Sequence, residues 1–207
     1  MKNQSLYLFF CLFIFGCGGG GGGSSMPEQV IVDNDNSYQG ETCADTNRVG
    51  MKKCDLKHDN IDRFYYVYTP NNLDSNKSIP VLFAFHGYGS SAMRHLNYTN
   101  YFSLADLNNF IVVYPQGSTT ATLSSHWNVG GWTSKSTTKD IDFVDTVIDL
   151  LKDKISIDEL RIYSSGMSNG GYMGYHLACN LSSKFAAIAS VTGSMTNDTF
   201  NDCNPSH

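Results

Sequence analysis

Ser168 lies in a Gly-x-Ser-x-Gly pattern over residues 166–170 (GMSNG). A strand-like run, residues 160–164, ends before this pattern, and a helix-like run, residues 169–181, begins after it. Glycines in a tight strand-to-helix turn remove Cβ atoms that would clash, and such a turn exposes a serine hydroxyl at the carboxyl edge of a sheet. The pattern therefore predicts Ser168 as the nucleophile of an acyl-transfer reaction. The alternative is a plain glycine-rich turn with a capping serine.

Two backbone amides are candidates for binding the oxyanion of that reaction. The Asn169 amide lies at the start of the predicted helix, where it can donate to a developing negative charge. The loop at residues 86–89 (HGYG) follows an apolar run, residues 80–85, and a second donor is expected here from the Tyr88 amide. His86 and Gly87 are predicted to support this loop, and His86 is disfavoured as a catalytic base.

The other histidines are poor candidates for the base. His176 lies eight residues after Ser168 on the same predicted helix, which is ~12 Å along the helix axis and out of hydrogen-bond reach. His58 and His95 lie in polar stretches and are predicted to be solvated. His207 is the terminal residue and is interpreted as a chance occurrence.

Asp140 and Asp142 precede the nucleophile in the chain. Acidic residues favour the first turn of a helix, because they face the positive end of the helix dipole. The two residues are therefore predicted to be a helix-start cluster. A displaced catalytic acid is the less favoured alternative.

Strand-like and helix-like runs alternate along the chain, which predicts a mostly parallel sheet with helices on both faces. The predicted strands are residues 64–69, 80–85, 110–114, 160–164 and 185–191, and the predicted helices are residues 101–108, 140–154 and 169–181. Residues 116–139 form a long Ser/Thr/Gly-rich loop that contains both tryptophans. A loop of this length within a compact domain is often functional.

The composition excludes some classes of protein. The chain has 207 residues, a formal net charge of −5 and 13% aromatic residues. This length predicts one domain, and the aromatic content is too high for a disordered chain. Lysines and arginines are scattered rather than gathered in a basic stripe, so no nucleic-acid partner is expected.

The N-terminus is predicted to direct export. Residues 1–16 contain one lysine and a short apolar run, which indicates a signal peptide because the run is too short to span a bilayer. Cys17 follows a lipobox-like sequence and is the predicted lipid-attachment site. Residues 17–30, with six consecutive glycines, are predicted to be a lipid-anchored tether. The alternative is an ordinary signal peptide that leaves a soluble secreted protein.

Export makes disulfides the expected state of the remaining cysteines. Cys11 would be removed with the signal peptide, and four other cysteines allow three pairings. The favoured set is Cys43–Cys54, which would hold residues 31–60 as an N-terminal loop, and Cys179–Cys203. Zinc is disfavoured because the chain has no CxxC pair and no histidine at ligand spacing, so no metal is expected.

From Phe64 to Pro205 the chain resembles exported esterases of the polyhydroxybutyrate depolymerase type and the related feruloyl and acetylxylan esterases. The matching stretches are PVLFAFHGYGS, FIVVYPQG, WNVGGW, KDIDFV, RIYSSGMSNGGYM, LAC and FAAIASVTG. The resemblance implies an α/β-hydrolase fold, no metal or organic cofactor, and ester hydrolysis by a Ser-Asp-His triad. By motif position, Ser168 corresponds to the nucleophile, and Tyr88 and Asn169 correspond to the oxyanion amides.

The resemblance also places His126, Trp127 and Asn128 in a loop that borders the substrate cleft. Trp127 and the nearby Trp132 could stack on sugar or aryl groups of a substrate. Alternatively, both tryptophans pack the loop onto the body of the domain.

The chain departs from the family where the acid and base of the triad are expected. In this fold the order along the chain is Ser, Asp or Glu, then His, and neither partner is found at a motif-matched position after Ser168. Residues 61–207 are therefore expected to be a partial domain without its C-terminal strands, and this 207-residue chain is expected to be inactive. The alternative is a complete protein that has lost catalysis.

The function predicted from these features is an exported serine carboxylic-ester hydrolase acting on extracellular polyester or esterified polysaccharide. The alternatives are a feruloyl or acetylxylan esterase, and a non-catalytic surface lipoprotein that binds glycans; a protease is less favoured. The expected partners are a polymeric or oligomeric ester and, through Cys17, a bacterial membrane. No protein partner is predicted.

Overall fold

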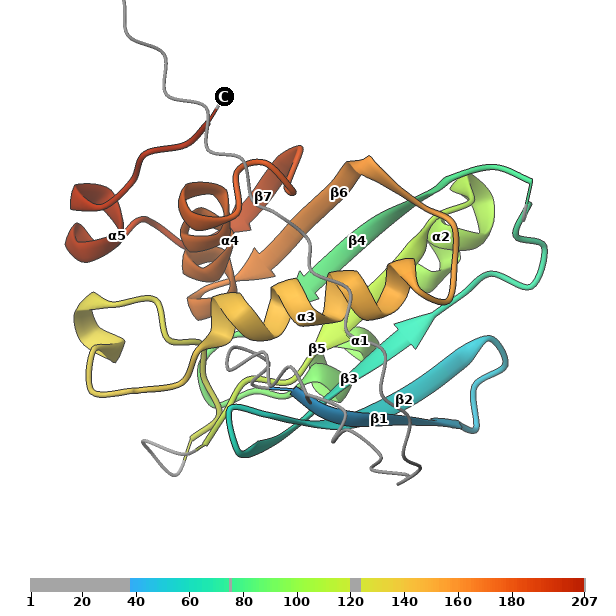
Figure 1. The fold of residues 1–207 in the computed structure, drawn as a ribbon, viewed down its shortest axis with the longest axis horizontal. Coiled ribbons are helices and arrows are strands. Elements are labelled where there is room, and N and C mark those ends of the chain that lie inside the picture. Colours follow the sequence, from blue (N-terminus) through green and yellow to red (C-terminus); the bar gives the residue numbers. More distant parts are fainter. Residues whose placement is uncertain (1–37, 75, 120–123, 207) are drawn as a thin grey trace, which may run out of the picture. The chain divides into compact units, whose positions relative to one another are not determined.

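The computed structural model describes residues 38–74, 76–119 and 124–206, and these form one seven-stranded sheet with helices (Figure 1). The strands are β1 (Tyr38–Asp45), β2 (Met51–His58), β3 (Ile61–Tyr68), β4 (Ile79–Phe85), β5 (Ile111–Pro115), β6 (Ile157–Met167) and β7 (Ala187–Val191). The helices are α1 (Ala92–Thr99), α2 (Tyr101–Asn108), the 3-10 helix η1 (Gly131–Thr133), α3 (Asp140–Lys152), α4 (Asn169–Asn180) and α5 (Asn197–Asn201).

The sheet is mixed, with the strand order β1-β2-β3-β5-β4-β6-β7. Strands β5, β4, β6 and β7 pair in parallel. Strands β1, β2 and β3 are antiparallel, and β3 joins β5 in an antiparallel pair. The prediction of a mostly parallel sheet therefore needs correction, because half of the strand pairings are antiparallel. Two of these pairings involve β1 and β2, which were not predicted as strands, and the third joins β3 to β5.

Helices cover both faces of the sheet, as predicted. On one face, α3 and α4 pack on the larger apolar core, to which β4 contributes Val81, Phe83 and Phe85. On the other face, α1 and α2 pack on a smaller cluster that includes Ala84 and Val112. Figure 1 shows α3 crossing one face while α1 and α2 lie behind the strands. Alternate residues of a strand point to opposite faces, so one strand serves both cores.

The prediction that residues 31–60 form an N-terminal loop is wrong for the part of this range that the structure describes. Residues 38–58 form the antiparallel hairpin of β1 and β2, in which Cys43 and Cys54 are direct cross-strand partners. Side chains of β1 are mostly exposed, so the strand has no apolar alternation that sequence analysis could detect. It forms by pairing with β2, whose buried residues recur along the strand.

The structure contains both predicted disulfides, Cys43–Cys54 and Cys179–Cys203. The first lies within the β1–β2 hairpin, and the second joins α4 to the residue that follows the C-cap of α5. The proposed signal peptide (residues 1–16), Cys11, Cys17 and the tether (residues 17–30) lie outside the described residues, as does His207.

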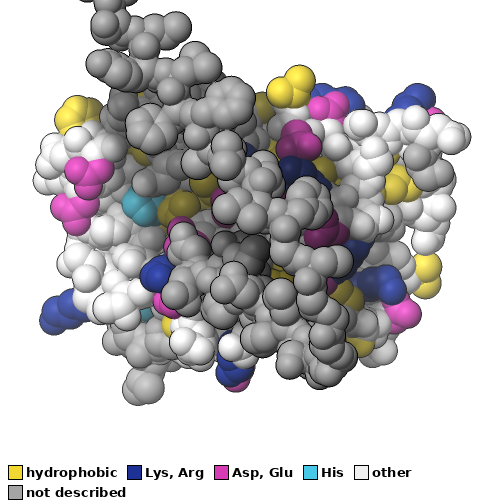
Figure 2. Space-filling model, in the orientation of Figure 1, with side chains coloured by type: hydrophobic (Ala, Val, Ile, Leu, Met, Phe, Trp, Pro, Cys, Tyr) yellow, Lys and Arg dark blue, Asp and Glu magenta, His cyan; other side chains and the backbone are white. Residues whose placement is uncertain are grey.

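Two surface properties bear on the predicted partners. Within the described ranges, no helix is long and apolar enough to cross a bilayer. On the described part of the face in Figure 2, basic and acidic side chains lie interspersed. This part of the surface therefore lacks the basic stripe that is typical of nucleic-acid-binding proteins.

Candidate active site

Ser168 occupies a strained turn between β6, which ends at Met167, and α4, which begins at Asn169. Its backbone has φ 53° and ψ −120°, a conformation that costs a non-glycine residue free energy. A Cβ on Gly166 would collide with the Gly170 carbonyl oxygen, and a Cβ on Gly170 would collide with the carbonyl oxygen of Phe85. The predicted strand-to-helix turn is therefore present, and both glycines are required by close backbone contact.

The neighbours of Ser168 hold its backbone and leave its hydroxyl available. The Ser168 amide donates to the Val191 carbonyl at 2.8 Å, and the Ser168 carbonyl accepts from the Tyr172 amide at 3.0 Å. The side chain is half-buried. In the part of the chain that the structure describes, no histidine hydrogen-bonds to the Ser168 hydroxyl.

Asn169 contributes its side chain as well as its amide. Its Oδ1 accepts from the Trp127 amide at 2.7 Å, and its Nδ2 donates to the Trp127 carbonyl at 3.1 Å. The side chain is fully buried. This pair of bonds joins the long loop to the first turn of α4, whose amides have no acceptor within the helix. Sequence analysis assigned only the amide, because the partner lies 42 residues away.

The loop that carries Tyr88 lies directly beside this turn. A Cβ on Gly87 would lie 3.3 Å from the Met167 carbonyl oxygen and 3.6 Å from the Ser168 Cβ. The structure therefore brings the two segments that contain the predicted oxyanion amides, at Tyr88 and Asn169, close to Ser168.

His86 is held as a neutral side chain under this loop. Its Nδ1 donates to the Gly87 carbonyl at 2.8 Å, and its Nε2 accepts from the Gly117 amide at 2.9 Å. Burial lowers the pKa of His86 to about 4. Because both ring nitrogens are occupied, the geometry favours the supporting role predicted for His86 and Gly87 over a role as base.

The two tryptophans have different environments. Trp127 is fully buried, its Nε1 donates to the His86 carbonyl at 2.9 Å, and its ring packs edge-on against Phe85. Trp132, on η1, is 54% exposed. Trp127 therefore packs the loop onto the domain, whereas Trp132 presents its ring to solvent.

Four rings form a continuous cluster that we call the aromatic rim. Tyr88 lies between His126 and Trp132, with ring centroids 5.7 and 5.6 Å away, and Trp132 contacts Tyr172 edge-on at 5.9 Å. Tyr88 lies in the loop at residues 86–89 that packs against the Ser168 turn, and Tyr172 lies one helical turn after Ser168. The rim therefore borders the candidate nucleophile with aromatic surface.

Asp140 lies in the first turn of α3, as predicted, but it does more than start a helix. It is buried with Arg63, and its Oδ1 accepts from the Arg63 guanidinium at 2.7 Å. Its Oδ2 accepts from the Asn128 amide at 2.7 Å and from the Thr138 hydroxyl at 3.0 Å. The carboxylate therefore fixes both ends of the loop segment that contains Trp132.

The prediction of solvated side chains for His58 and His95 is wrong. His58 is 1% exposed and His95 is 6% exposed. Burial lowers the pKa of both, that of His95 to about 4. The polar sequence around each residue hid its position, because His58 faces α3 from the end of β2 and His95 faces the sheet from α1.

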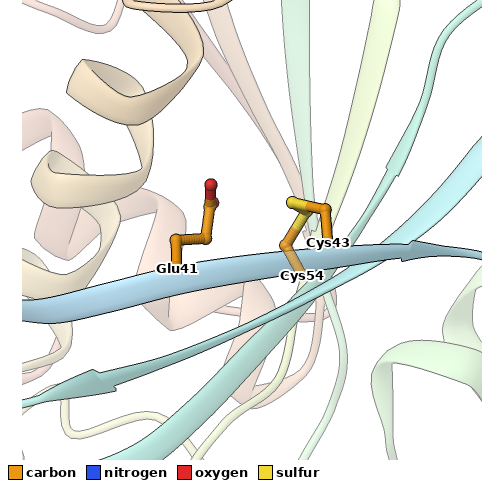
Figure 3. A group of neighbouring side chains, drawn as sticks. All are labelled: Glu41, Cys43 and Cys54. Atoms are coloured by element: carbon orange, nitrogen blue, oxygen red, sulfur yellow. A yellow bond between two sulfur atoms is a disulfide. The ribbon is translucent and has the colours of Figure 1, made fainter.

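One side-chain group outside this site has the composition of a metal site. Glu41, Cys43 and Cys54 lie close together (Figure 3). The two cysteines form a disulfide and supply no thiolate ligand. The Glu41 carboxylate accepts from the Tyr65 hydroxyl and pairs with Lys154. The donor set therefore does not suit a metal ion.

Comparison with known proteins supports the fold described above. A profile of the prolyl oligopeptidase family matches residues 95–204, which is more than half of the chain. The chain belongs to this family. The assignment and the observed sheet confirm the α/β-hydrolase fold expected from the sequence.

Two curated relatives of this prolyl oligopeptidase family member are esterases. A bifunctional acetylxylan esterase/xylanase of Neocallimastix patriciarum is 37% identical over 131 residues, covering 63% of this chain and 18% of that protein. Feruloyl esterase B of Thermothelomyces thermophilus is 34% identical over 130 residues, covering 62% of this chain and 43% of that protein. The chain thus spans less than half the length of either relative.

A solved structure supports the fold. The acetyl xylan esterase from Aspergillus awamori matches with a TM-score of 0.51 and 21% identity, over 66% of this chain and 51% of that chain. The resemblance to feruloyl and acetylxylan esterases is therefore supported. The polyhydroxybutyrate depolymerase part of the resemblance stays a prediction.

Proposed function

We propose that this protein is an exported serine carboxylic-ester hydrolase that acts on esterified extracellular polysaccharide. The observation that carries the proposal is the strained Ser168 turn, set between β6 and α4 with the Gly87–Tyr88 loop against it. Backbone strain at a nucleophile is typical of functional sites. The esterase relatives support an ester as the substrate bond.

The proposed reaction begins with attack of the Ser168 hydroxyl on the ester carbonyl carbon. A general base takes the serine proton, and the new oxyanion accepts hydrogen bonds from the Asn169 and Tyr88 amides. The alcohol leaves with a proton, and water then releases the acid from the acyl-enzyme. Because acid and base follow the nucleophile in this fold, we propose that both lie outside residues 38–206 of the whole protein.

The aromatic rim favours a ring-bearing substrate. Tyr88 and Trp132 are 45% and 54% exposed, although aromatic side chains of this size are commonly buried. Their exposure beside Ser168 suits stacking on an aryl acid or a sugar ring. A feruloylated polysaccharide is therefore the first proposed substrate, and acetylated xylan and hydroxybutyrate oligomers are the others.

The proposal also includes the route of the protein to its substrate. Residues 1–16 direct export, and Cys17 carries the lipid that anchors the mature chain to a bacterial membrane. Replacing Cys17 by alanine is expected to release the protein from the membrane fraction without changing the fold of residues 38–206. Membrane retention of the Cys17→Ala protein would contradict lipid anchoring.

The decisive experiment measures hydrolysis by the protein expressed from its whole reading frame. We expect turnover of methyl ferulate, acetylated xylan or hydroxybutyrate oligomers, and Ser168→Ala should reduce it by about 10⁴-fold or more. Wild-type turnover by Ser168→Ala would overturn the assignment of the nucleophile. Absence of ester turnover by the wild-type protein, together with binding of xylan oligosaccharides, would favour the glycan-binding alternative. Hydrolysis of a peptide substrate would test for the oligopeptidase activity for which the family is named.

A further inference from the structure

The short helix α5 is bonded to the loop that carries Trp132. The Asp198 carboxylate accepts from the Gly131 amide at 2.6 Å, and the hydroxyls of Thr196 and Thr199 donate to the Val129 carbonyl at 2.8 and 3.1 Å. These bonds span 67 to 70 residues of sequence. They hold Val129, which lies just before η1, and Gly131, the first residue of η1, on which Trp132 also lies.

The packing between these segments is also close. A Cβ on Gly130 would lie 2.9 Å from the Asp198 Cβ, and a Cβ on Gly131 would lie 3.1 Å from the Thr196 side chain. Both glycines have positive φ, 69° and 55°. The loop backbone therefore lies directly on α5 in a conformation that glycine adopts without strain.

Two contacts tie α5 to α4, the helix that begins at the candidate nucleophile. The Cys179–Cys203 disulfide links α4 to the end of the α5 segment. The Nδ1 of His176, on α4, lies 2.9 Å from the Thr199 hydroxyl. The tautomer of His176 decides which of these two groups is the donor. Partial burial lowers the pKa of His176, which agrees with a neutral ring.

The orientation of the Trp132 side chain depends on these contacts between the α5 segment and the loop. Its ring contacts are with Tyr88 and Tyr172, and more than half of its surface is exposed. Because the side chain is more than half exposed, its orientation depends strongly on the position of its backbone, and the contacts with α5 hold that backbone.

From these contacts we infer that α5 positions the aromatic rim, and that Asp198 is a positioning residue for the aryl or sugar ring of the substrate. The inference rests on the proposed function for the identity of the ligand. The part that concerns Trp132 alone does not depend on it. Removing the Asp198 carboxylate is expected to free the η1 backbone and to weaken binding of ring-bearing esters.

Tryptophan fluorescence tests the structural part directly. The chain has two tryptophans, and acrylamide reaches the exposed Trp132 but not the fully buried Trp127. Asp198→Ala is expected to increase quenching and to speed the anisotropy decay. Asp198→Asn, which keeps an acceptor oxygen, should restore much of the wild-type signal. Asn201→Ala, an exposed change on the same helix, should match the wild type.

Ligand binding tests the functional part without requiring turnover. In the Ser168→Ala background, Asp198→Ala is expected to raise the Kd for methyl ferulate about fivefold, the effect of one lost hydrogen bond, while the Kd for a short acetyl ester stays within about twofold. Cys203→Ser should act in the same direction. It serves as the second variant if Asp198→Ala lowers the melting temperature strongly.

The outcomes separate the inference from the proposed function. Unchanged quenching and anisotropy in both Asp198→Ala and Cys203→Ser would overturn the positioning role. A loosened Trp132 with an unchanged Kd for methyl ferulate would overturn the link to substrate. If methyl ferulate binds as expected but the wild-type protein hydrolyses no ester, the proposed function fails and the positioning role stands.

Discussion

At the scale of single residues, Asp140 shows how a buried charge can organise a site. Its carboxylate accepts from Arg63, Asn128 and Thr138, and the Arg63 guanidinium lies 3.9 Å from the centroid of the Phe143 ring. A buried pair of this kind adds little net stability, but removing one partner leaves the other uncompensated in a medium of low dielectric constant.

We therefore expect Asp140→Ala to lower the free energy of unfolding by about 3 kcal/mol or more. Urea titration measures this change. The matched control is Asp142→Ala, in the same helical turn but exposed, which should cost less than about 1 kcal/mol. Equal losses in the two variants would show that the Arg63–Asp140 pair is no more than a helix-start interaction.

At the scale of elements, the strand-to-helix turn at Ser168 is defined by close backbone contacts. Gly170 approaches the Phe85 carbonyl oxygen too closely for any side chain, so α4 packs against the end of β4 as well as against β6. Gly174, one turn further along α4, has room: a Cβ there would meet its nearest neighbour, the Ser164 hydroxyl, at 3.4 Å.

This difference predicts opposite tolerance of the same substitution. Gly170→Ala should lower the free energy of unfolding by roughly 3 kcal/mol, because the backbone of the turn must move. Gly174→Ala should be close to neutral or slightly stabilising, since the site has room for a Cβ and alanine has the higher helix propensity, by up to about 1 kcal/mol. Chemical denaturation of both variants checks the comparison, and a stable Gly170→Ala protein would disprove the stated contact.

The hairpin of β1 and β2 shows that pairing can override a polar sequence. β1 has mostly exposed side chains, yet it adds a full strand to the sheet and carries one half of a disulfide. The favoured Cys43–Cys54 pairing was predicted from the sequence, but the strands that bring these cysteines together were not.

At the scale of the whole molecule, burial of several histidines makes stability depend on pH. Burial lowers the pKa of His58, His86, His95 and His176, and for His86 and His95 the folded value is about 4 against 6.5 in the reference state. Below pH 6.5 the unfolded chain therefore binds protons that the folded protein does not. Stability is largest above this pH and falls as the pH drops toward 4.

His95 offers a test of this dependence, because it lies on α1 outside the candidate site and its Nε2 is buried without a hydrogen-bond partner. His95→Leu should reduce the slope of unfolding free energy between pH 6 and 5 by about 1.4 kcal/mol per pH unit. Urea titrations at a series of pH values measure the slope, and exposed Asn97→Ala on the same helix is the control. An unchanged slope in His95→Leu would mean that His95 is protonated in the folded protein.

The sequence by itself determined the features that depend on neighbours in the chain. The glycines around Ser168, the apolar runs of β4 and β5, and the helical spacing of α2, α3 and α4 are local patterns, because turn sterics and periodic burial act over a few residues. The order of these elements predicted a sheet covered by helices on both faces, and the resemblance to the esterases implied the α/β-hydrolase fold. Two short helices were missed: α1 has eight residues and α5 has five.

Only the tertiary structure decided which distant residues build the surroundings of Ser168. The bonds of Asn169 to Trp127, Arg63 to Asp140 and Gly131 to Asp198 join residues 42, 77 and 67 positions apart. Such contacts depend on how sheet and helices pack, and no local pattern encodes them. For the same reason, the sequence named both tryptophans without distinguishing them. Packing decided that Trp127 supports the loop and that Trp132 is exposed against the rings of Tyr88 and Tyr172.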